Sequence, residues 1–118
     1  MTRFPVRAPT IRVRGATMYR LTVLYPPPVD PDHFRTYYEE KHLPLARRLP
    51  NLRAMTYSLA VTGLARESPY FAIWAADFES AEVMQEALDS AVGRQLTADV
   101  PNYATGGALI LHYPLHND

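Results

Sequence analysis

Apolar and aromatic residues between positions 30 and 51 recur in steps of three and four, the spacing of one face of an α-helix. The residues between them are mostly charged or polar, so the pattern predicts an amphipathic helix. Asp30 suits the N-cap, Pro31 fits the first helical position, and Pro50 ends the helix. The predicted buried stripe consists of Phe34, Tyr37, Tyr38, His42, Leu45 and Leu49.

Pro44 interrupts this helix, because proline has no N–H for the carbonyl of Glu40 and disfavours helical geometry at Leu43. We therefore expect a kink or break between Glu40 and Pro44, which leaves backbone carbonyls near His42 without a helical partner. An imidazole beside an irregular helical turn and two tyrosines is the best site candidate in the chain.

The rest of the chain alternates between strand-like and helical patterns. Period-two alternation predicts strands at residues 18–25, 52–62, 70–78 and 106–113. Ser80 is a suitable N-cap for a second helix at residues 79–90, and a short helical turn is expected at 94–99, before Pro101. The order β-α-β-β-α-β predicts an α+β, ferredoxin-like fold, in which a four-stranded antiparallel sheet carries both helices on one face.

The predicted strands carry apolar residues on both faces, although helices cover only one face of the sheet. The other face would be a larger apolar patch than a soluble monomer usually exposes. We therefore expect a homodimer in which the two sheets pack face to face as an α+β barrel. Residues 18–113 form the predicted domain, and residues 114–118 a tail.

Residues 1–17 differ in composition from the predicted domain. They hold four of the twelve basic residues and no acidic residue, and two prolines interrupt any regular pattern. The segment is interpreted as a flexible basic arm, or as an over-extended start with Met18 the natural beginning. The alternative is an arm that crosses to a partner subunit.

Composition excludes several classes of protein. Twelve basic and twelve acidic residues give zero formal net charge, which argues against a general nucleic-acid binder. The chain has no cysteine, which rules out disulfides and thiolate catalysis. No apolar run approaches membrane-spanning length and no secretory signal is recognisable, so we expect no membrane partner and a cytoplasmic location.

Two motifs resemble those of a known family. A Tyr-x-x-x-His-x-Pro-Leu run extends from Tyr38 to Leu45, and Leu-Pro-x-Leu extends from Leu49 to Leu52. Together with DVPNYATG near the end of the chain, they resemble the EthD-domain family of the dimeric α+β barrel superfamily, over residues 18–113. Asn51 replaces the usual glycine of the second motif, a mild departure because asparagine also tolerates left-handed backbone.

The resemblance implies a face-to-face homodimer and says less about activity. EthD-like proteins are associated with bacterial degradation of ethers and other small organic compounds, and many have no assigned reaction. Similar barrels include cofactor-free cyclases and isomerases, monooxygenases and haem enzymes, so the fold cannot choose among these reactions.

His42 is the predicted catalytic residue, because an imidazole titrates near neutral pH and can act as a general acid or base. The predicted partner is Tyr38, whose phenol can hold a substrate oxygen. The alternative for both is a structural role in the core. Further residues that can line a substrate pocket, or else pack in the core or dimer interface, are Tyr37, Tyr25, Trp74, His112 and Asn102.

Metal and nucleotide chemistry find no support. The four histidines are scattered along the chain, the carboxylates lie on the predicted solvated faces, and no Gly-rich phosphate loop follows a strand. We therefore expect no metal and no cofactor. The leading hypothesis is a cofactor-free isomerase, cyclase or lyase acting by proton transfer on a small apolar carbonyl or aromatic metabolite. The alternatives are a non-catalytic dimer that binds such a ligand or serves a partner oxygenase, and a cofactor-free monooxygenase or haem-binding barrel.

Overall fold

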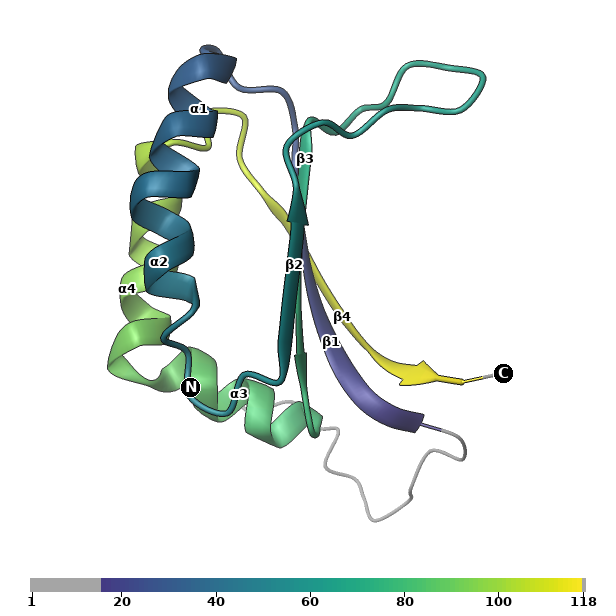
Figure 1. The fold of residues 1–118 in the computed structure, drawn as a ribbon, viewed down its shortest axis with the longest axis vertical. Helices are drawn as coiled ribbons and strands as arrows, with labels where there is room; N and C mark the ends of the chain where they lie inside the picture. Colours follow the sequence, from purple (N-terminus) through teal and green to yellow (C-terminus); the bar gives the residue numbers. More distant parts are fainter. Residues whose placement is uncertain (1–15, 118) are drawn as a thin grey trace.

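The computed structural model describes residues 16–117, in which a single sheet carries helices on one face (Figure 1). The strands are β1 (Ala16–Tyr25), β2 (Ala54–Ser58), β3 (Ala72–Phe78) and β4 (Leu109–His116). The helices are α1 (Pro31–Tyr37), α2 (Leu43–Ala46), α3 (Ala81–Asp89) and α4 (Ala91–Asp99), with a π-helical turn η2 (Tyr38–His42) and a 3-10 turn η3 (Val100–Asn102). None of these helices is long and apolar enough to cross a membrane.

The strand order in the sheet is β2-β3-β1-β4, and all three pairings are antiparallel. Long crossovers through the helices bring β1 between β3 and β4. This confirms the predicted ferredoxin-like arrangement. The core lies between the sheet and the helices, where the inward positions of β1 and β3 are buried: Leu21, Val23, Tyr25, Ala72, Trp74, Ala76 and Phe78.

The helix does not break at Pro44; instead, its hydrogen-bond pattern changes locally. Residues 38–42 form a π-helical turn, in which the N–H of Leu43 donates to the carbonyl of Tyr38, five residues earlier. Such a turn lets the helix pass Pro44, which cannot donate, and α1, η2 and α2 follow one another without a gap. The extra residue in the turn shifts the buried face. Leu43 and Ala46 are fully buried, whereas Leu45 of the predicted stripe is only half-buried.

Several element boundaries differ from the predicted ones. β2 spans only five residues, because the chain leaves the sheet after Ser58 and runs out into the long β2–β3 connection (Figure 1). β4 continues through 114–116, the start of the predicted tail, because these residues still pair with the beginning of β1. The predicted arm lies outside the described residues, except for residues 16–17, which belong to β1.

The helical turn predicted at 94–99 is a complete helix, α4. Ser90 ends α3 and also begins α4, because its extended backbone breaks the helix while its hydroxyl accepts from the N–H of Gly93. At Gly93 the two helices approach so closely that a Cβ atom would lie 2.3 Å from the carbonyl oxygen of Ala87. This tight junction directs α4 back across the sheet toward α2.

The open face of the sheet is mixed rather than purely apolar. One side of this face is apolar and carries Leu24, Ile73, Leu109 and Leu111. At the other side, the guanidinium of Arg20 donates to the carboxylate of Asp77 over 2.7 and 3.0 Å. Between them Thr22 and Tyr113 are joined by a 2.8 Å hydrogen bond. Leu111 is still 43% exposed in the single chain. The open face therefore combines apolar residues with a fixed polar pattern.

Candidate functional site

His42 lies in a buried aromatic cluster at the π-helical turn. Its ring stacks on Tyr38, with centroids 5.2 Å apart, and lies 4.7 Å from the ring centroid of Tyr103. Tyr25 of β1 packs against both tyrosine rings, at 5.6 Å from each. The irregular turn thus places an imidazole inside the core, between the sheet and the segment that follows α4.

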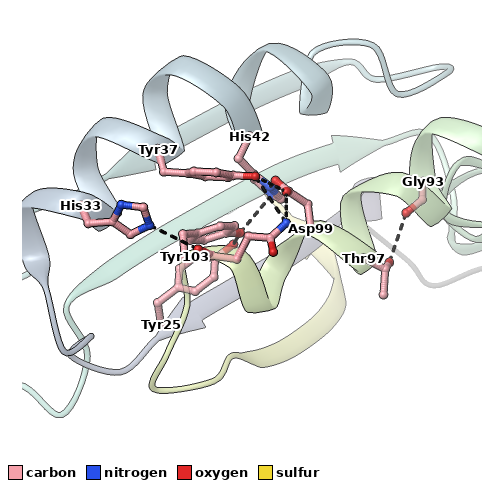
Figure 2. Close-up of polar contacts among 9 residues, drawn as sticks. Tyr25, His33, Tyr37, His42, Gly93, Thr97, Asp99 and Tyr103 are labelled. Carbon is pink, nitrogen blue, oxygen red and sulfur yellow. Dashed lines mark hydrogen bonds and ion pairs between the residues drawn. The ribbon is translucent and has the colours of Figure 1, made fainter.

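Both ring nitrogens of His42 make hydrogen bonds within the protein (Figure 2). Nδ1 lies 2.8 Å from Oδ2 of Asp99, and Nε2 lies 3.1 Å from the hydroxyl of Tyr103. The hydroxyl of Tyr103 is in turn 2.8 Å from the hydroxyl of Tyr25. The result is one continuous chain of hydrogen bonds, Asp99–His42–Tyr103–Tyr25.

The chemistry of these groups fixes the direction of the chain. An ionised carboxylate only accepts, so Nδ1 of His42 carries a proton and donates to Asp99. In the neutral imidazole Nε2 is then an acceptor, so the hydroxyl of Tyr103 donates to it. Since Tyr103 uses its proton for His42, the hydroxyl of Tyr25 donates to Tyr103. The chain therefore runs from Tyr25 to His42.

The environment keeps His42 neutral. Burial lowers the pKa of His42 below its ordinary value, and the hydrogen bond and charge of Asp99 offset this effect only in part. Burial also raises the pKa values of Tyr25, Tyr38 and Tyr103, so all three phenols stay protonated near neutral pH. His42 can consequently take up a proton, and the phenols can pass one on.

Asp99, the last residue of α4, is held by three donors. Its Oδ1 accepts from the hydroxyl of Tyr37 over 2.6 Å and from Nδ2 of Asn102 over 2.9 Å, while Oδ2 accepts from His42. Partial burial acts to raise the pKa of Asp99, but the hydrogen bonds from Tyr37, Asn102 and His42 outweigh it and hold the pKa below its ordinary value. Asp99 is therefore a fixed anion that orients the imidazole, and Tyr37 and Asn102 orient Asp99.

An apolar cavity of about 130 Å³ lies between the helices and the sheet, and His42 and Tyr25 are part of its wall. The chain of hydrogen bonds therefore lies beside a space that can hold a small molecule. The other lining residues come from β1, β3 and β4, from α3 and α4, and from the segments that follow α2 and α4: Leu21, Val23, Leu49, Trp74, Leu88, Leu96, Thr97, Val100 and Ile110.

The structure brings some predicted site residues together and separates others. Trp74 lines the cavity, as His42 and Tyr25 do. Tyr38 touches His42 but does not line the cavity, and its buried hydroxyl has no hydrogen-bond partner within residues 16–117. His112 is 2.6 Å from the hydroxyl of Tyr19, outside the cavity lining.

Tyr37 and Asn102 lie on the far side of Asp99 from His42. Both line a surface hollow between α1–α2 and α4 rather than the cavity, so in the structure they contact the carboxylate and not the substrate space. Asp99 itself was not among the predicted site residues, nor was Tyr103 assigned a role at His42. A carboxylate at the C-terminus of a helix faces the negative end of the dipole, and this unfavourable position is the sequence signal for Asp99.

A haem or metal site does not fit these residues. A haem ligand would need a free ring nitrogen on His42, but Asp99 and Tyr103 occupy both. The cavity is about as large as one that holds a single benzene ring. Within residues 16–117, no cluster of three histidine, aspartate or glutamate side chains is arranged to hold a metal ion.

A family model described as the EthD domain matches residues 26–107. A curated relative, described as an uncharacterized 11.0 kDa protein in the thcB-thcC intergenic region of Rhodococcus erythropolis, is 32% identical over 94 residues, which is 80% of this chain and 91% of that protein. A crystal structure of an ethyl tert-butyl ether D (EthD) family protein from Bacillus halodurans C-125 is 26% identical and covers 82% of this chain and 97% of its own, with a TM-score of 0.77.

More distant structures share the fold alone. A dimeric protein of unknown function with a ferredoxin-like fold from Bacteroides fragilis is 11% identical, with a TM-score of 0.61, and covers 83% of this chain and 96% of its own. SnoaB from Streptomyces nogalater, a cofactor-independent oxygenase, is also 11% identical, with a TM-score of 0.62. The match covers 87% of this chain and 97% of SnoaB.

Proposed function

The chain belongs to the EthD domain family, and from this premise we propose that it is a small cofactor-free enzyme. Its reaction is a proton transfer, of the isomerase, cyclase or lyase class, on a small apolar carbonyl or aromatic metabolite. The observation that carries the proposal is the chain Asp99–His42–Tyr103–Tyr25, which joins a fixed carboxylate and a neutral imidazole to the wall of an apolar cavity.

His42 is the base in this proposal, and it acts through two phenols. A substrate hydroxyl gives its proton to Tyr25, Tyr25 passes its own proton to Tyr103, and Tyr103 passes its proton to Nε2 of His42. The product is an enolate or phenolate in the cavity and an imidazolium that faces Asp99. The negative charge of Asp99 stabilises the imidazolium, as an aspartate does in a catalytic triad. Tyr25 then delivers a proton to a carbon of the enolate or phenolate, which gives the keto tautomer, and the proton of the imidazolium returns through Tyr103 to Tyr25. The reverse sequence converts a ketone to its enol.

Tyr38, which the sequence analysis expects to hold the substrate oxygen, does not contact the substrate in this mechanism. Tyr25 lines the cavity and belongs to the relay, so we assign the contact with the substrate oxygen to Tyr25. Tyr38 stacks on the imidazole and fixes the plane of the ring. Tyr37 and Asn102 are positioning residues that hold Asp99.

One observation favours a second function, that of a binding protein without turnover. Both ring nitrogens of His42 are already occupied by protein groups, which is also what a structural histidine requires. This alternative predicts that small apolar ligands bind in the cavity and leave unchanged. The similarity to a cofactor-independent oxygenase extends to the fold only.

The proposed assembly is a homodimer formed by the open faces of two sheets. The exposed apolar residues of that face and the dimeric state of the Bacteroides fragilis protein of like fold support it. The cavity lies on the opposite face of the sheet, beneath the helices. Each subunit would thus carry its own site.

Hydrogen exchange tests proton transfer without knowledge of the natural substrate. The protein is incubated in deuterated buffer with cyclohexanone, acetophenone or resorcinol, and deuterium at ring or α-carbon positions is followed by NMR. We expect catalysed exchange with at least one compound and a loss of about 10²-fold or more in His42→Gln and in Asp99→Asn. His116→Gln, an exposed histidine outside the cavity, is the matched control. Exchange that persists in His42→Gln would contradict the role of His42, and binding without exchange would favour the second function.

A further inference from the structure

We propose that the β2–β3 connection, residues 59–71, clasps the second subunit of the homodimer, with Leu64 at its tip packed against Leu109 of the partner subunit. This inference rests on the proposed homodimer, and it specifies how the two subunits are oriented and which segment holds them together. The polarity of the open face, the order of the strands and the shape of the connection carry it.

The polarity of the open face selects one orientation of the partner. The apolar end of this face carries Leu24 and Leu109, and its charged end carries the ion pair of Arg20 and Asp77. Removing that ion pair from water against leucine side chains would cost free energy without a compensating contact. A two-fold axis parallel to the strands avoids this cost, because it places the apolar end of one face on the apolar end of the other.

The order of the strands then decides which edges meet. A two-fold axis along the strands reverses the order β2-β3-β1-β4 across the interface, so β2 of each subunit faces β4 of its partner. Ser58, where the connection leaves β2, lies in the same row of the sheet as Leu109 at the start of β4, since Ile73 and Leu24 pair between them. The connection of one subunit therefore begins opposite Leu109 of the partner subunit.

The connection is long enough to reach the partner. It projects from the sheet on the side away from the helices, and its two legs run outward together (Figure 1). A leg of six residues, 59–64, spans up to about 20 Å, whereas two sheets that pack face to face lie about 10 Å apart. The tip is therefore able to cross the interface and lie along the edge strand of the partner.

The connection has no core of its own. None of its thirteen residues is buried in the single chain, and Leu64 is 94% exposed. Its charged residues are Arg66 and Glu67, which are of opposite sign, so charge does not attract the connection to a membrane or a nucleic acid. Leu109 is itself 41% exposed in the single chain. An apolar tip opposite an exposed apolar strand favours contact between two copies of this chain.

Hydrogen bonds give the connection a fixed shape before it binds. At its base, the N–H of Val61 donates to the carbonyl of Phe71 over 3.2 Å, and the N–H of Phe71 donates to the carbonyl of Tyr25 over 2.7 Å. Further out, the hydroxyl of Ser68 donates to the carbonyl of Tyr70 over 2.9 Å and accepts from the N–H of the same residue over 3.0 Å. A segment that is already ordered loses little conformational entropy on binding.

Photocrosslinking from the tip tests the contact directly. The chain has no cysteine, so Leu64→Cys can be labelled at one position with a benzophenone maleimide, mixed with isotopically enriched wild-type chains and irradiated. We expect a covalent dimer in which position 64 is joined to residues 95–118 of the enriched chain, the tryptic peptide that contains β4. Val29→Cys, at an 87% exposed position between β1 and α1, is the matched control and should give no covalent dimer.

The variant Leu64→Asp measures the strength of the contact. A symmetric dimer contains the contact twice, and burial of one leucine side chain favours association by about 10-fold or more. We therefore expect Leu64→Asp to raise the dissociation constant of the dimer, measured by analytical ultracentrifugation, about 10²-fold or more. Val29→Asp should leave this constant within about 2-fold of the wild-type value. Leu64 is exposed in the single chain, so its substitution does not disturb the fold of the monomer.

A dimer whose position 64 forms no cross-link between subunits would overturn this inference and leave the proposed dimer standing, and so would an unchanged dissociation constant in Leu64→Asp. Cross-links to peptides other than 95–118 would overturn the orientation, and covalent products larger than a dimer would assign the tip to a neighbouring dimer. A monomeric wild type would remove both the dimer and the clasp. Neither measurement involves catalysis, so the expected cross-link without His42-dependent exchange removes only the proposed catalysis.

Discussion

Tyr103→Phe and Tyr38→Phe are the same substitution in one aromatic cluster, yet we expect opposite effects on stability. Both rings are fully buried, and phenylalanine keeps both rings in place. The hydroxyl of Tyr103 bonds to His42 and to Tyr25, whereas the hydroxyl of Tyr38 has no hydrogen-bond partner within residues 16–117. The two variants therefore isolate the hydrogen bonds from the packing.

The magnitudes follow from the bonds that each hydroxyl makes. Loss of two hydrogen bonds at about 1 kcal/mol each, with Nε2 of His42 left as a buried acceptor without a donor, gives a cost of roughly 2–3 kcal/mol for Tyr103→Phe. For a chain of this length that is a fall in Tm of roughly 8–12 °C. Tyr38→Phe removes a buried hydroxyl that lacks a partner, so its stability should equal or exceed that of the wild type by up to about 1 kcal/mol.

Urea denaturation followed by tryptophan fluorescence measures both changes. All proteins are compared at one concentration, since dimerisation would make the apparent stability depend on concentration. An unchanged m-value confirms that the unfolded reference state is the same. Equal losses in the two variants would refute the reasoning, because ring packing rather than the hydrogen-bonded chain would then explain them.

Three further predictions concern other parts of the molecule. Burial lowers the pKa of His42, so the unfolded chain takes up a proton at a higher pH than the folded one, and the free energy of unfolding should fall as pH drops below about 6.5. Urea denaturation at each pH should show a smaller fall in His42→Gln. An equal dependence of stability on pH in the two proteins would contradict this prediction. Asn51 has φ 60, a left-handed backbone conformation that favours glycine. The free energy of unfolding of Asn51→Gly should therefore lie within about 0.5 kcal/mol of the wild-type value, and Asn51→Val should lose about 1–2 kcal/mol. A tolerated valine in thermal unfolding would argue against left-handed backbone there. Leu111→Glu on the open sheet face should convert the proposed dimer to a monomer in analytical ultracentrifugation, and a variant that stays dimeric would exclude this face as the interface.

Local patterns in the sequence were sufficient to predict the fold. The alternation of apolar residues located all four strands, because side chains on opposite faces of a sheet meet different environments. The N-caps Asp30 and Ser80 are confirmed, since each side chain accepts from a backbone N–H three residues later. The ends of the strands were less well predicted, because pairing with a neighbouring strand, rather than the residue pattern, decides how far each strand extends.

The sequence by itself determined the order of the elements, the irregular turn at Pro44 and the candidacy of His42. Only the tertiary structure decided what His42 touches. Its partners Asp99 and Tyr103 lie 57 and 61 residues away in the chain, and they reach the imidazole because Gly93 and Ser90 turn α4 back toward α2. Periodicity reports which side of an element is buried, and it carries no information on which distant side chain meets that side. The hydrogen-bonded chain and the cavity therefore exist only once the helices have packed on the sheet.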